Sequence, residues 1–186
     1  MKYIKIMSRL AKKPIKIPEG VTVKKENDFY IFRGPKGETK KTFPEGVEIK
    51  LDGSNILLSL KKEDGIPAAI LGTAASLAKS AILGVVAPFE KKLEIEGVGY
   101  KAQLDGQNLS LSLGFTNPVK VVIPEGISVK LEKNVITLSG LDKEKVGSIA
   151  AQIRSQKPPE PYKGKGIHYA GEIIRRKAGK KAVAAA

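Results

Sequence analysis

The chain has 186 residues, of which 41% are hydrophobic and 5% aromatic, so it can form one large or two small domains with mainly aliphatic cores. It contains no cysteine and one histidine, which excludes disulfide frameworks, thiolate metal sites and clusters of several histidines. Its 33 basic and 19 acidic residues give a net charge of +14, whose meaning depends on where the charge lies in the chain. No cofactor is expected.

The chain begins with a basic segment. Residues 1–16 contain six basic residues and no acidic residue, and we expect them to form a basic arm. Arg9 and Lys12 are its candidate contacts with a polyanion. The basic start leads into Pro14 and Pro18 without the apolar stretch of a secretory signal, so a cytoplasmic protein is expected.

The first half of the chain is predicted to form strands followed by one helix. Apolar and β-branched segments between Gly, Asp and Asn turns predict strands at residues 21–23, 29–32, 39–43, 47–51 and 56–60. The apolar run 66–88 consists largely of weakly hydrophobic alanine and contains Lys79. A buried helix is therefore favoured over a membrane span.

The second half shows the same order of elements. Strands are predicted at residues 93–104, 109–113, 119–123, 127–131 and 135–138. A helix is predicted to begin near Asp142, a good N-cap residue, and to end before Pro158. Its apolar face is formed by Val146, Ile149, Ala150 and Ile153.

The two halves align when the sequence is shifted by 80 residues. Residues 44–46 then fall on residues 124–126, both Pro-Glu-Gly, and Gly34 falls on Gly114. This repeat predicts an α+β fold of two tandem similar domains, each an antiparallel sheet packed against one helix. We expect a basic arm at 1–16, domains at 17–84 and 85–170, and a basic tail at 171–186.

The excess positive charge is segregated at the two ends. Residues 17–144 carry 17 basic and 17 acidic side chains, whereas residues 145–186 carry ten basic side chains against two acidic ones. Such segregation is typical of a protein that binds a polyanion, and nucleic acid is the commonest one. Neutralisation of phosphates would then supply most of the affinity.

The most informative pattern lies at residues 157–169. Its prolines favour extended backbone, and the sequence Lys-Gly-Lys-Gly at 163–166 alternates cations with residues that permit close backbone approach. The flanking rings of Tyr162, His168 and Tyr169 are suited to stacking on unpaired bases. A solvated surface loop is the alternative interpretation of the Lys–Gly alternation by itself.

A second glycine pattern carries less weight. Gly97–Ala102 formally satisfies the dinucleotide-binding pattern G-x-G-x-x-G/A, but that fingerprint must open a helix and this segment continues as a predicted hairpin. We interpret Gly97 and Gly99 as marking a bulge. Tyr100 and Lys101 are then a ring and a charge placed beside segment 157–169.

The segment Pro159–Ile167, with the sequence Pro-Glu-Pro-Tyr-Lys-Gly-Lys-Gly-Ile, resembles the signature of bacterial-type large ribosomal subunit protein six, the L-six family. Residues 7–21 resemble that family's amino terminus, and residues 93–100 and 111–115 resemble its central hairpin, so the resemblance covers about residues 7–178. It implies a structural, non-enzymatic component of the large subunit. It also implies binding to 23S-type rRNA through the carboxy-terminal domain, near the sarcin–ricin loop, the docking region of translational GTPases and the proteins of the stalk base.

Carried over to matching positions, the resemblance places residues 162–166 on RNA, and the distribution of charge and aromatic rings supplies further candidates. The candidate rRNA contacts are Arg9, Lys12, Tyr100, Lys101, Arg154, Lys157, Tyr162, Lys163, Gly164, Lys165, Gly166, His168, Tyr169, Arg175, Arg176, Lys177, Lys180 and Lys181. Arg154 and Lys157 have a competing structural role, because cations complement the dipole at a helix end. His168 has interior packing as its alternative. No catalytic or metal-binding residue is expected.

Two other functions stay open at this point. A free-standing RNA-binding or assembly factor would bind small RNAs and would not co-sediment with large subunits at high salt. A small α/β enzyme acting on an anionic substrate would lose turnover on Lys163→Ala or His168→Ala with rRNA affinity unchanged. No membrane and no small-molecule substrate is expected for the preferred ribosomal function.

Overall fold

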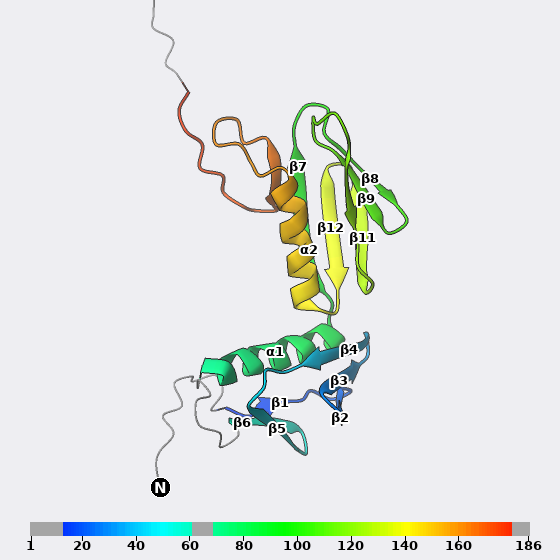
Figure 1. Cartoon of the computed structure of the whole chain (residues 1–186), viewed down its shortest axis with the longest axis vertical. Coiled ribbons are helices and arrows are strands. Elements are labelled where there is room, and N and C mark those ends of the chain that lie inside the picture. The colour runs from blue at the N-terminus through cyan, green and yellow to red at the C-terminus, as the bar shows by residue number, and fades with distance from the viewer. Residues whose placement is uncertain (1–12, 61–68, 180–186) are drawn as a thin grey trace, which may run out of the picture. The chain divides into compact units, whose positions relative to one another are not determined.

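The computed structural model describes residues 13–60 and 69–179, which divide into two compact units (Figure 1). The chain passes from the first unit to the second between Pro88 and Phe89. Each unit combines antiparallel β-strands with one α-helix, so the predicted α+β class is confirmed. The expected arm residues Arg9 and Lys12, and the tail residues Lys180 and Lys181, lie outside the described part of the chain.

The first unit contains two three-stranded antiparallel sheets and one helix. The sheets have the strand orders β2-β3-β4 and β1-β6-β5. Its elements are β1 (Ile15–Lys16), β2 (Thr22–Glu26), β3 (Phe29–Gly34), β4 (Gly37–Thr42), β5 (Val47–Asp52), β6 (Asn55–Leu60) and α1 (Ala69–Val86). The predicted strands are thus all present, but they form two sheets where one was expected.

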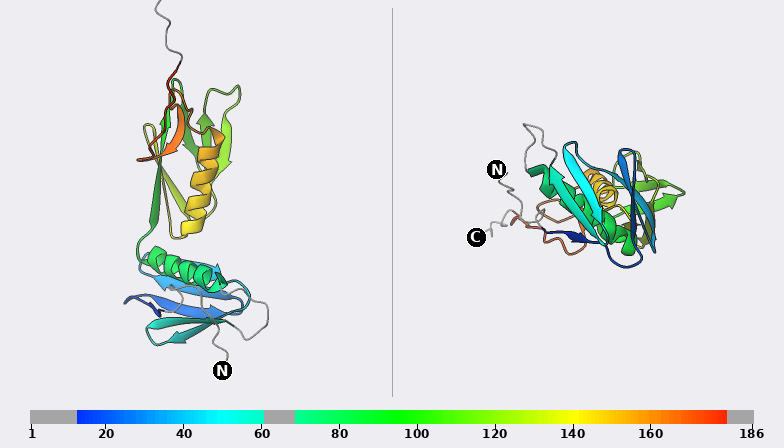
Figure 2. Two further views of the ribbon diagram at one scale, coloured as in Figure 1. Left: turned by 90° about the vertical axis from the view of Figure 1, so that its left-hand side faces the viewer. Right: turned by 90° about the horizontal axis from the view of Figure 1, so that it is seen from below.

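The helix α1 is long and apolar enough to cross a membrane by length and composition. Its alanines at positions 75, 78 and 81 are instead buried in one cluster with Phe32 of β3 and Ile56 of β6. The figures show α1 lying across the strands of this unit (Figure 2). The small side chains of α1 allow its backbone to approach the strands closely, which explains a helix rich in alanine at this position.

The second unit repeats this plan with one additional strand. Its sheets have the strand orders β10-β9-β8 and β11-β12-β7-β13. Its elements are β7 (Phe89–Glu96), β8 (Lys101–Asp105), β9 (Asn108–Ser112), β10 (Val119–Val122), β11 (Ile127–Glu132), β12 (Val135–Gly140), α2 (Lys143–Gln156) and β13 (Gly166–Tyr169). The helix α2 directly follows Asp142 and ends before Pro158, as the sequence predicts.

The prediction of one continuous strand at residues 93–104 is wrong. The chain leaves the four-stranded sheet at Glu96 and enters the three-stranded sheet at Lys101. A Cβ at Gly97 would lie 2.4 Å from the ring of Tyr100, and Gly99 has φ +77°, so the backbone turns sharply between the two strands. The two glycines therefore mark a crossover between sheets, where a bulge within one strand was expected.

The sequence repeat corresponds to a repeat in structure. β5 and β11, and likewise β6 and β12, are separated by 80 residues. Gly46 and Gly126, each just before one of these strands, both have φ +85°. In each unit the helix follows these paired strands, α1 after β6 and α2 after β12. Among the described residues of the first unit, no strand corresponds to β13.

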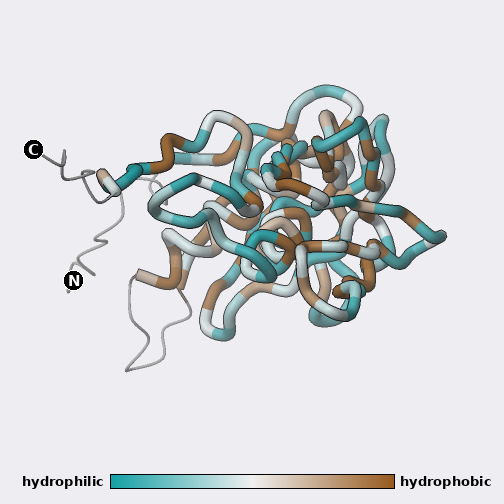
Figure 3. The backbone as a smooth tube through the Cα atoms, turned by 90° about the horizontal axis from the view of Figure 1, so that it is seen from above, coloured by the Kyte–Doolittle hydropathy of each residue, from teal (hydrophilic) through white to brown (hydrophobic). Residues whose placement is uncertain are grey.

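The core of the second unit lies between α2 and the sheets. Val146, Ile149, Ala150 and Ile153 of α2 are all buried, as their helical spacing predicts, and they belong to one cluster with buried residues of β7, β9, β12 and β13. Along β9 and β12, buried residues alternate with half-buried or exposed ones, as expected for strands with one packed face. Hydrophobic and hydrophilic stretches are interspersed along the described chain (Figure 3). β13 is thus held by the same core as the rest of the unit, and it fixes where the segment before it can lie.

Candidate nucleic-acid interface

The signature segment forms a closed loop, which we define as residues 157–166 and which connects α2 to β13. Its two ends are joined by the amide of Ile167, which donates to the carbonyl of Lys157 at 2.8 Å. Further in, the amide of Glu160 donates to the carbonyl of Lys165 at 2.8 Å, and the amide of Gly164 donates to the carbonyl of Glu160 at 2.9 Å. The loop is therefore ordered by its own backbone and does not depend on a partner for its shape.

The two glycines of the loop are both buried, although the sequence suggested that they allow a partner to approach. At Gly166, with φ +146°, a Cβ would lie 2.7 Å from the carbonyl oxygen of Pro158 and from the Cα of Pro159. At Gly164, with φ +75°, a Cβ would lie 3.0 Å from the guanidinium of Arg176. Both glycines thus make room for the protein's own chain, which is a structural reason for glycine at these positions, and their contact with RNA stays a prediction.

The outer side of the loop carries a ring and a cation exposed to solvent. Tyr162 is 54% exposed, Lys163 is exposed, and Lys165 and Lys157 are half-buried. The ammonium of Lys157 lies 4.6 Å from the centroid of the Phe115 ring, which is itself 49% exposed. Phe115 therefore extends the exposed surface next to the loop.

The described part of the tail, residues 170–179, returns to the loop. The amide of Lys177 donates to the carbonyl of Pro161 at 2.8 Å, and the side chain of Arg176 covers Gly164. Arg175, Arg176 and Lys177 are all exposed. The structure thus brings this basic cluster together with the loop into one surface, which we call the loop–tail surface.

Arg154, at the end of α2, is engaged within the protein. Its Nε and Nη2 donate to the two carboxylate oxygens of Glu172 at 3.1 and 2.6 Å, and the amide of Tyr169 donates to the same carboxylate at 3.0 Å. The hydrogen bond from Arg154, followed by that from Tyr169, lowers the pKa of Glu172, and the bond to Glu172 raises the pKa of Arg154. The charge of Arg154 is therefore balanced by Glu172, which favours a structural role for Arg154 over contact with a phosphate.

Comparison with known sequences agrees with the resemblance of the signature segment. The sequence model of the family Ribosomal protein L6 matches residues 17–86 and 96–170 of the chain. The chain belongs to the ribosomal protein L6 family. The matched ranges correspond closely to one unit each and include the loop and β13, whereas the tail lies beyond them.

Individual members of the L6 family match over almost the full chain. Large ribosomal subunit protein uL6 of Beijerinckia indica is 48% identical over 176 residues, which cover 94% of this chain and 99% of that protein. The uL6 protein of Protochlamydia amoebophila is 48% identical over 177 residues, covering 95% and 98% respectively. Large ribosomal subunit protein uL6c of Guillardia theta is 44% identical over 175 residues, covering 94% and 98%.

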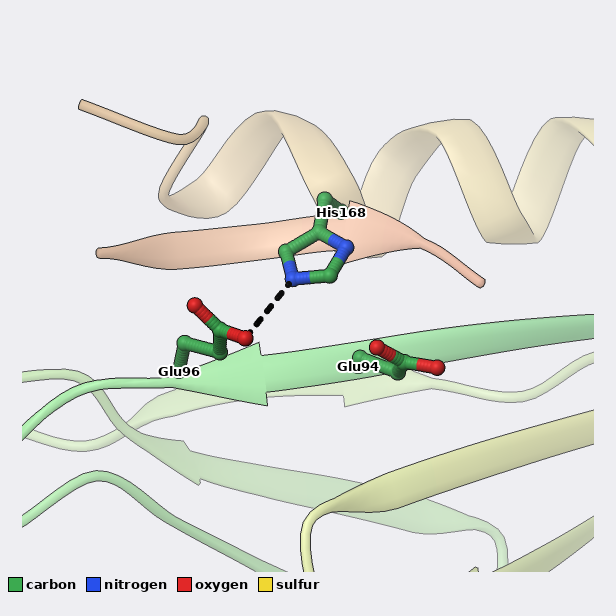
Figure 4. A group of neighbouring side chains, drawn as sticks. All are labelled: Glu94, Glu96 and His168. Carbon is green, nitrogen blue, oxygen red and sulfur yellow. Dashed lines mark ion pairs between the residues drawn. The ribbon is translucent and has the colours of Figure 1, made fainter. Parts of the chain in front are cut away.

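Within this L6 fold, the lone histidine is not at the surface. His168 is 5% exposed and lies on β13, where its ring faces the side chains of Glu94 and Glu96 on β7 (Figure 4). His168 is therefore unsuited to contact RNA from this position, and the structure supports the alternative that its ring is packed in the interior. Alternation along β13 explains this orientation, because the buried Ile167 on its other face belongs to the helix-covered core.

The remaining ring candidates also have packing roles. Tyr169 is half-buried, and the cations of Lys91 and Arg154 each lie 5.6 Å from its ring centroid. Tyr100 packs against the core of the second unit and covers Gly97, whereas Lys101 is exposed on β8. Reasoning from sequence did not select Phe115 as a contact, although an aromatic residue directly after Gly114 in a polar turn was a usable signal.

Proposed function

We propose that the chain is a structural, non-enzymatic component of the large ribosomal subunit, located in cytoplasmic ribosomes, that binds 23S-type rRNA through its loop–tail surface. The observation that carries this proposal is the gathering of exposed Lys163, Arg175, Arg176 and Lys177 on one side of the second unit. Residues 157–177 contain six basic and two acidic side chains, and one of those acids, Glu172, is balanced by Arg154. A surface of this charge suits the phosphate backbone of folded RNA.

The proposed mechanism combines charge with shape. The exposed lysines and arginines neutralise phosphates, while the exposed rings of Tyr162 and Phe115 are placed to stack on unpaired bases or sugars. The closed backbone of the loop holds Tyr162 and Lys163 in place, and the bond from the amide of Lys177 to the carbonyl of Pro161 holds the tail beside them. Recognition would therefore depend on the shape of the RNA more than on its sequence.

We further propose a location for the protein within the subunit. Resemblance to the L-six family supports a site near the sarcin–ricin loop and the docking region of translational GTPases, with proteins of the stalk base as neighbours. Residues 17–88 carry ten basic and nine acidic side chains, and this near balance favours contact with neighbouring proteins for the first unit.

The dependence of rRNA binding on salt tests the proposal. Binding of the purified chain to a large-subunit rRNA fragment is measured over a range of salt concentrations for the wild type and for the double variant Lys163→Ala/Lys165→Ala. Loss of two phosphate contacts should weaken binding and reduce the slope of log K against log salt by about 1.4 to 1.8. The control is Lys24→Ala/Lys40→Ala, which removes the same charge from exposed positions on β2 and β4 of the first unit.

An equal change in slope for both double variants would show that only net charge matters, and would contradict binding through the loop–tail surface. An unchanged slope for Lys163→Ala/Lys165→Ala would exclude direct phosphate contact by these lysines. Co-sedimentation of each variant with large subunits through a high-salt gradient separates a resident ribosomal protein from a free-standing factor.

A further inference from the structure

Two neighbouring strands place an imidazole and two carboxylates on the same face of the four-stranded sheet. His168 of β13 pairs directly with Glu94 of β7 in the antiparallel register, and Glu96 follows two residues later on the same face. One ligand atom from each of the three side chains lies within 4.8 Å of the other two, and Nε2 of His168 is 3.7 Å from Oε1 of Glu96 (Figure 4).

The ring of His168 is held in a defined tautomer. Its Nδ1 lies 3.1 Å from the carbonyl oxygen of Tyr169, and because a carbonyl can only accept, Nδ1 carries the hydrogen. In the neutral ring this leaves a lone pair on Nε2. That atom is fully buried and has no hydrogen-bond partner among the described residues, although it points towards the carboxylate of Glu96 (Figure 4). A buried nitrogen without a partner is costly, so a missing partner at this position needs a physical explanation.

We propose that His168, Glu94 and Glu96 form a binding site for a divalent transition-metal ion of the Zn²⁺ type. An imidazole whose Nδ1–H is bonded to a backbone carbonyl and whose Nε2 is free is the usual form of a histidine ligand. A tetrahedral Zn²⁺ holds its nitrogen and oxygen ligands about 3.4 Å apart. The 3.7 Å between Nε2 and Glu96 is too long for a good hydrogen bond but close to this ligand separation.

The surroundings allow an ion to enter and favour a particular class of ion. The side chain of Glu96 is 51% exposed, so the site is open from that side, while the buried His168 closes it from the other. Three protein ligands leave one position for water. The nitrogen ligand favours Zn²⁺, Co²⁺ or Ni²⁺ over Mg²⁺ and Ca²⁺, which prefer oxygen ligands throughout.

A metal ion at this site would join β13 to β7. Because β13 directly follows the loop, the ion would stabilise the strand to which the loop–tail surface is attached, without itself contacting RNA. The site therefore goes beyond rRNA binding, and its existence does not depend on the proposed function.

The test uses the full-length chain without a polyhistidine tag, freed of metal with a chelator. Zn²⁺ binding is measured by calorimetry, and Co²⁺ serves as a spectroscopic probe of nitrogen and oxygen ligands. We expect one ion per chain, a shift of the imidazole NMR signals, and affinity at least tenfold lower in His168→Gln and in Glu96→Gln. The assignment is unambiguous because the chain has a single histidine and no cysteine. Glu125→Gln is the matched control, because Glu125 is an exposed carboxylate in the turn before β11, whose first residue Ile127 pairs at the opposite end of this sheet from Glu94 and Glu96.

Binding that survives either His168→Gln or Glu96→Gln would show adventitious coordination by surface carboxylates and would overturn the proposal. So would the absence of Zn²⁺ binding at millimolar concentration, since the three groups would then be neighbours that hold no ion. If the His168→Gln chain fails to fold because this residue is buried, Glu96→Gln still tests the site, since Glu96 is exposed. An unchanged circular dichroism spectrum of Glu96→Gln would show that its loss of Zn²⁺ binding is local.

Discussion

Replacing Gly166 by alanine should open the signature loop. A Cβ at this position would lie 2.7 Å from the carbonyl oxygen of Pro158 and the Cα of Pro159, and both are backbone atoms that cannot move without displacing the loop. The φ of +146° adds strain for any residue other than glycine. The strained dihedral costs about 1–3 kcal/mol, and the overpacking costs a similar amount, so the second unit should lose about 3 kcal/mol or more of stability.

Gly171→Ala is the matched control, because Gly171 has φ +79° but open space within 4 Å of the added Cβ. It should cost only about 1 kcal/mol, the ordinary penalty of a left-handed backbone for alanine. Urea denaturation followed by circular dichroism and by amide NMR signals of β13 measures both variants. Hydrogen exchange at the amide of Ile167, which closes the loop on Lys157, reports the local change.

In Gly166→Ala, the amide of Ile167 should lose protection and rRNA affinity should fall with it. Equal costs for Gly166→Ala and Gly171→Ala would refute the packing explanation, since only the first position meets backbone atoms. Retained protection of the Ile167 amide would show that the loop accommodates a Cβ by another route.

Three further substitutions in the second unit have expected outcomes. Glu172→Gln should destabilise it by about 1–2 kcal/mol near neutral pH. The hydrogen bond from Arg154, and after it that from Tyr169, lowers the pKa of Glu172 in the folded state. The stability difference between wild type and Glu172→Gln is therefore present above about pH 4.3 and vanishes as further acidification protonates the carboxylate. A stability difference that does not change with pH in urea titrations would contradict the ion pair. Ile153→Ala removes a fully buried side chain and should lower the free energy of unfolding by about 3 kcal/mol in urea titrations, and a loss below about 1 kcal/mol would show that the core is not packed as described. Phe115→Ala should weaken binding to an rRNA fragment about tenfold without changing its salt slope, whereas unchanged affinity would remove this ring from the interface.

Much of the fold could be predicted because its signals are local. The alternation in β9, the turns before β5 and β11, and the apolar face of α2 each lie within one element and determine its type. The division of each sheet into two could not be predicted this way. It depends on the turn at Gly97–Tyr100 and on pairings between distant strands, such as β13 with β7, which single-sequence periodicity does not report.

In the candidate site, too, local sequence signals predict some features, whereas others depend on tertiary structure. The exposure of Lys163 and of the cluster at 175–177 agrees with the prediction from charge segregation, because unpaired like charges remain in water. Arg154 and His168 belong to the same basic and aromatic pattern, but their partners, Glu172 and the carboxylates of β7, are brought to them by tertiary structure. Sequence spacing alone could not separate these engaged side chains from those that face solvent.

The three backbone hydrogen bonds within the signature loop have a consequence for ribosome assembly. Immobilising a flexible segment costs roughly 1–2 kcal/mol per residue, and a segment that becomes ordered only on its target loses that amount from its affinity. Here residues 157–166 are closed by backbone hydrogen bonds of the chain itself. If the loop binds rRNA as proposed, nearly all the energy of its contacts would be available for holding the RNA, and binding would need no folding step in the loop.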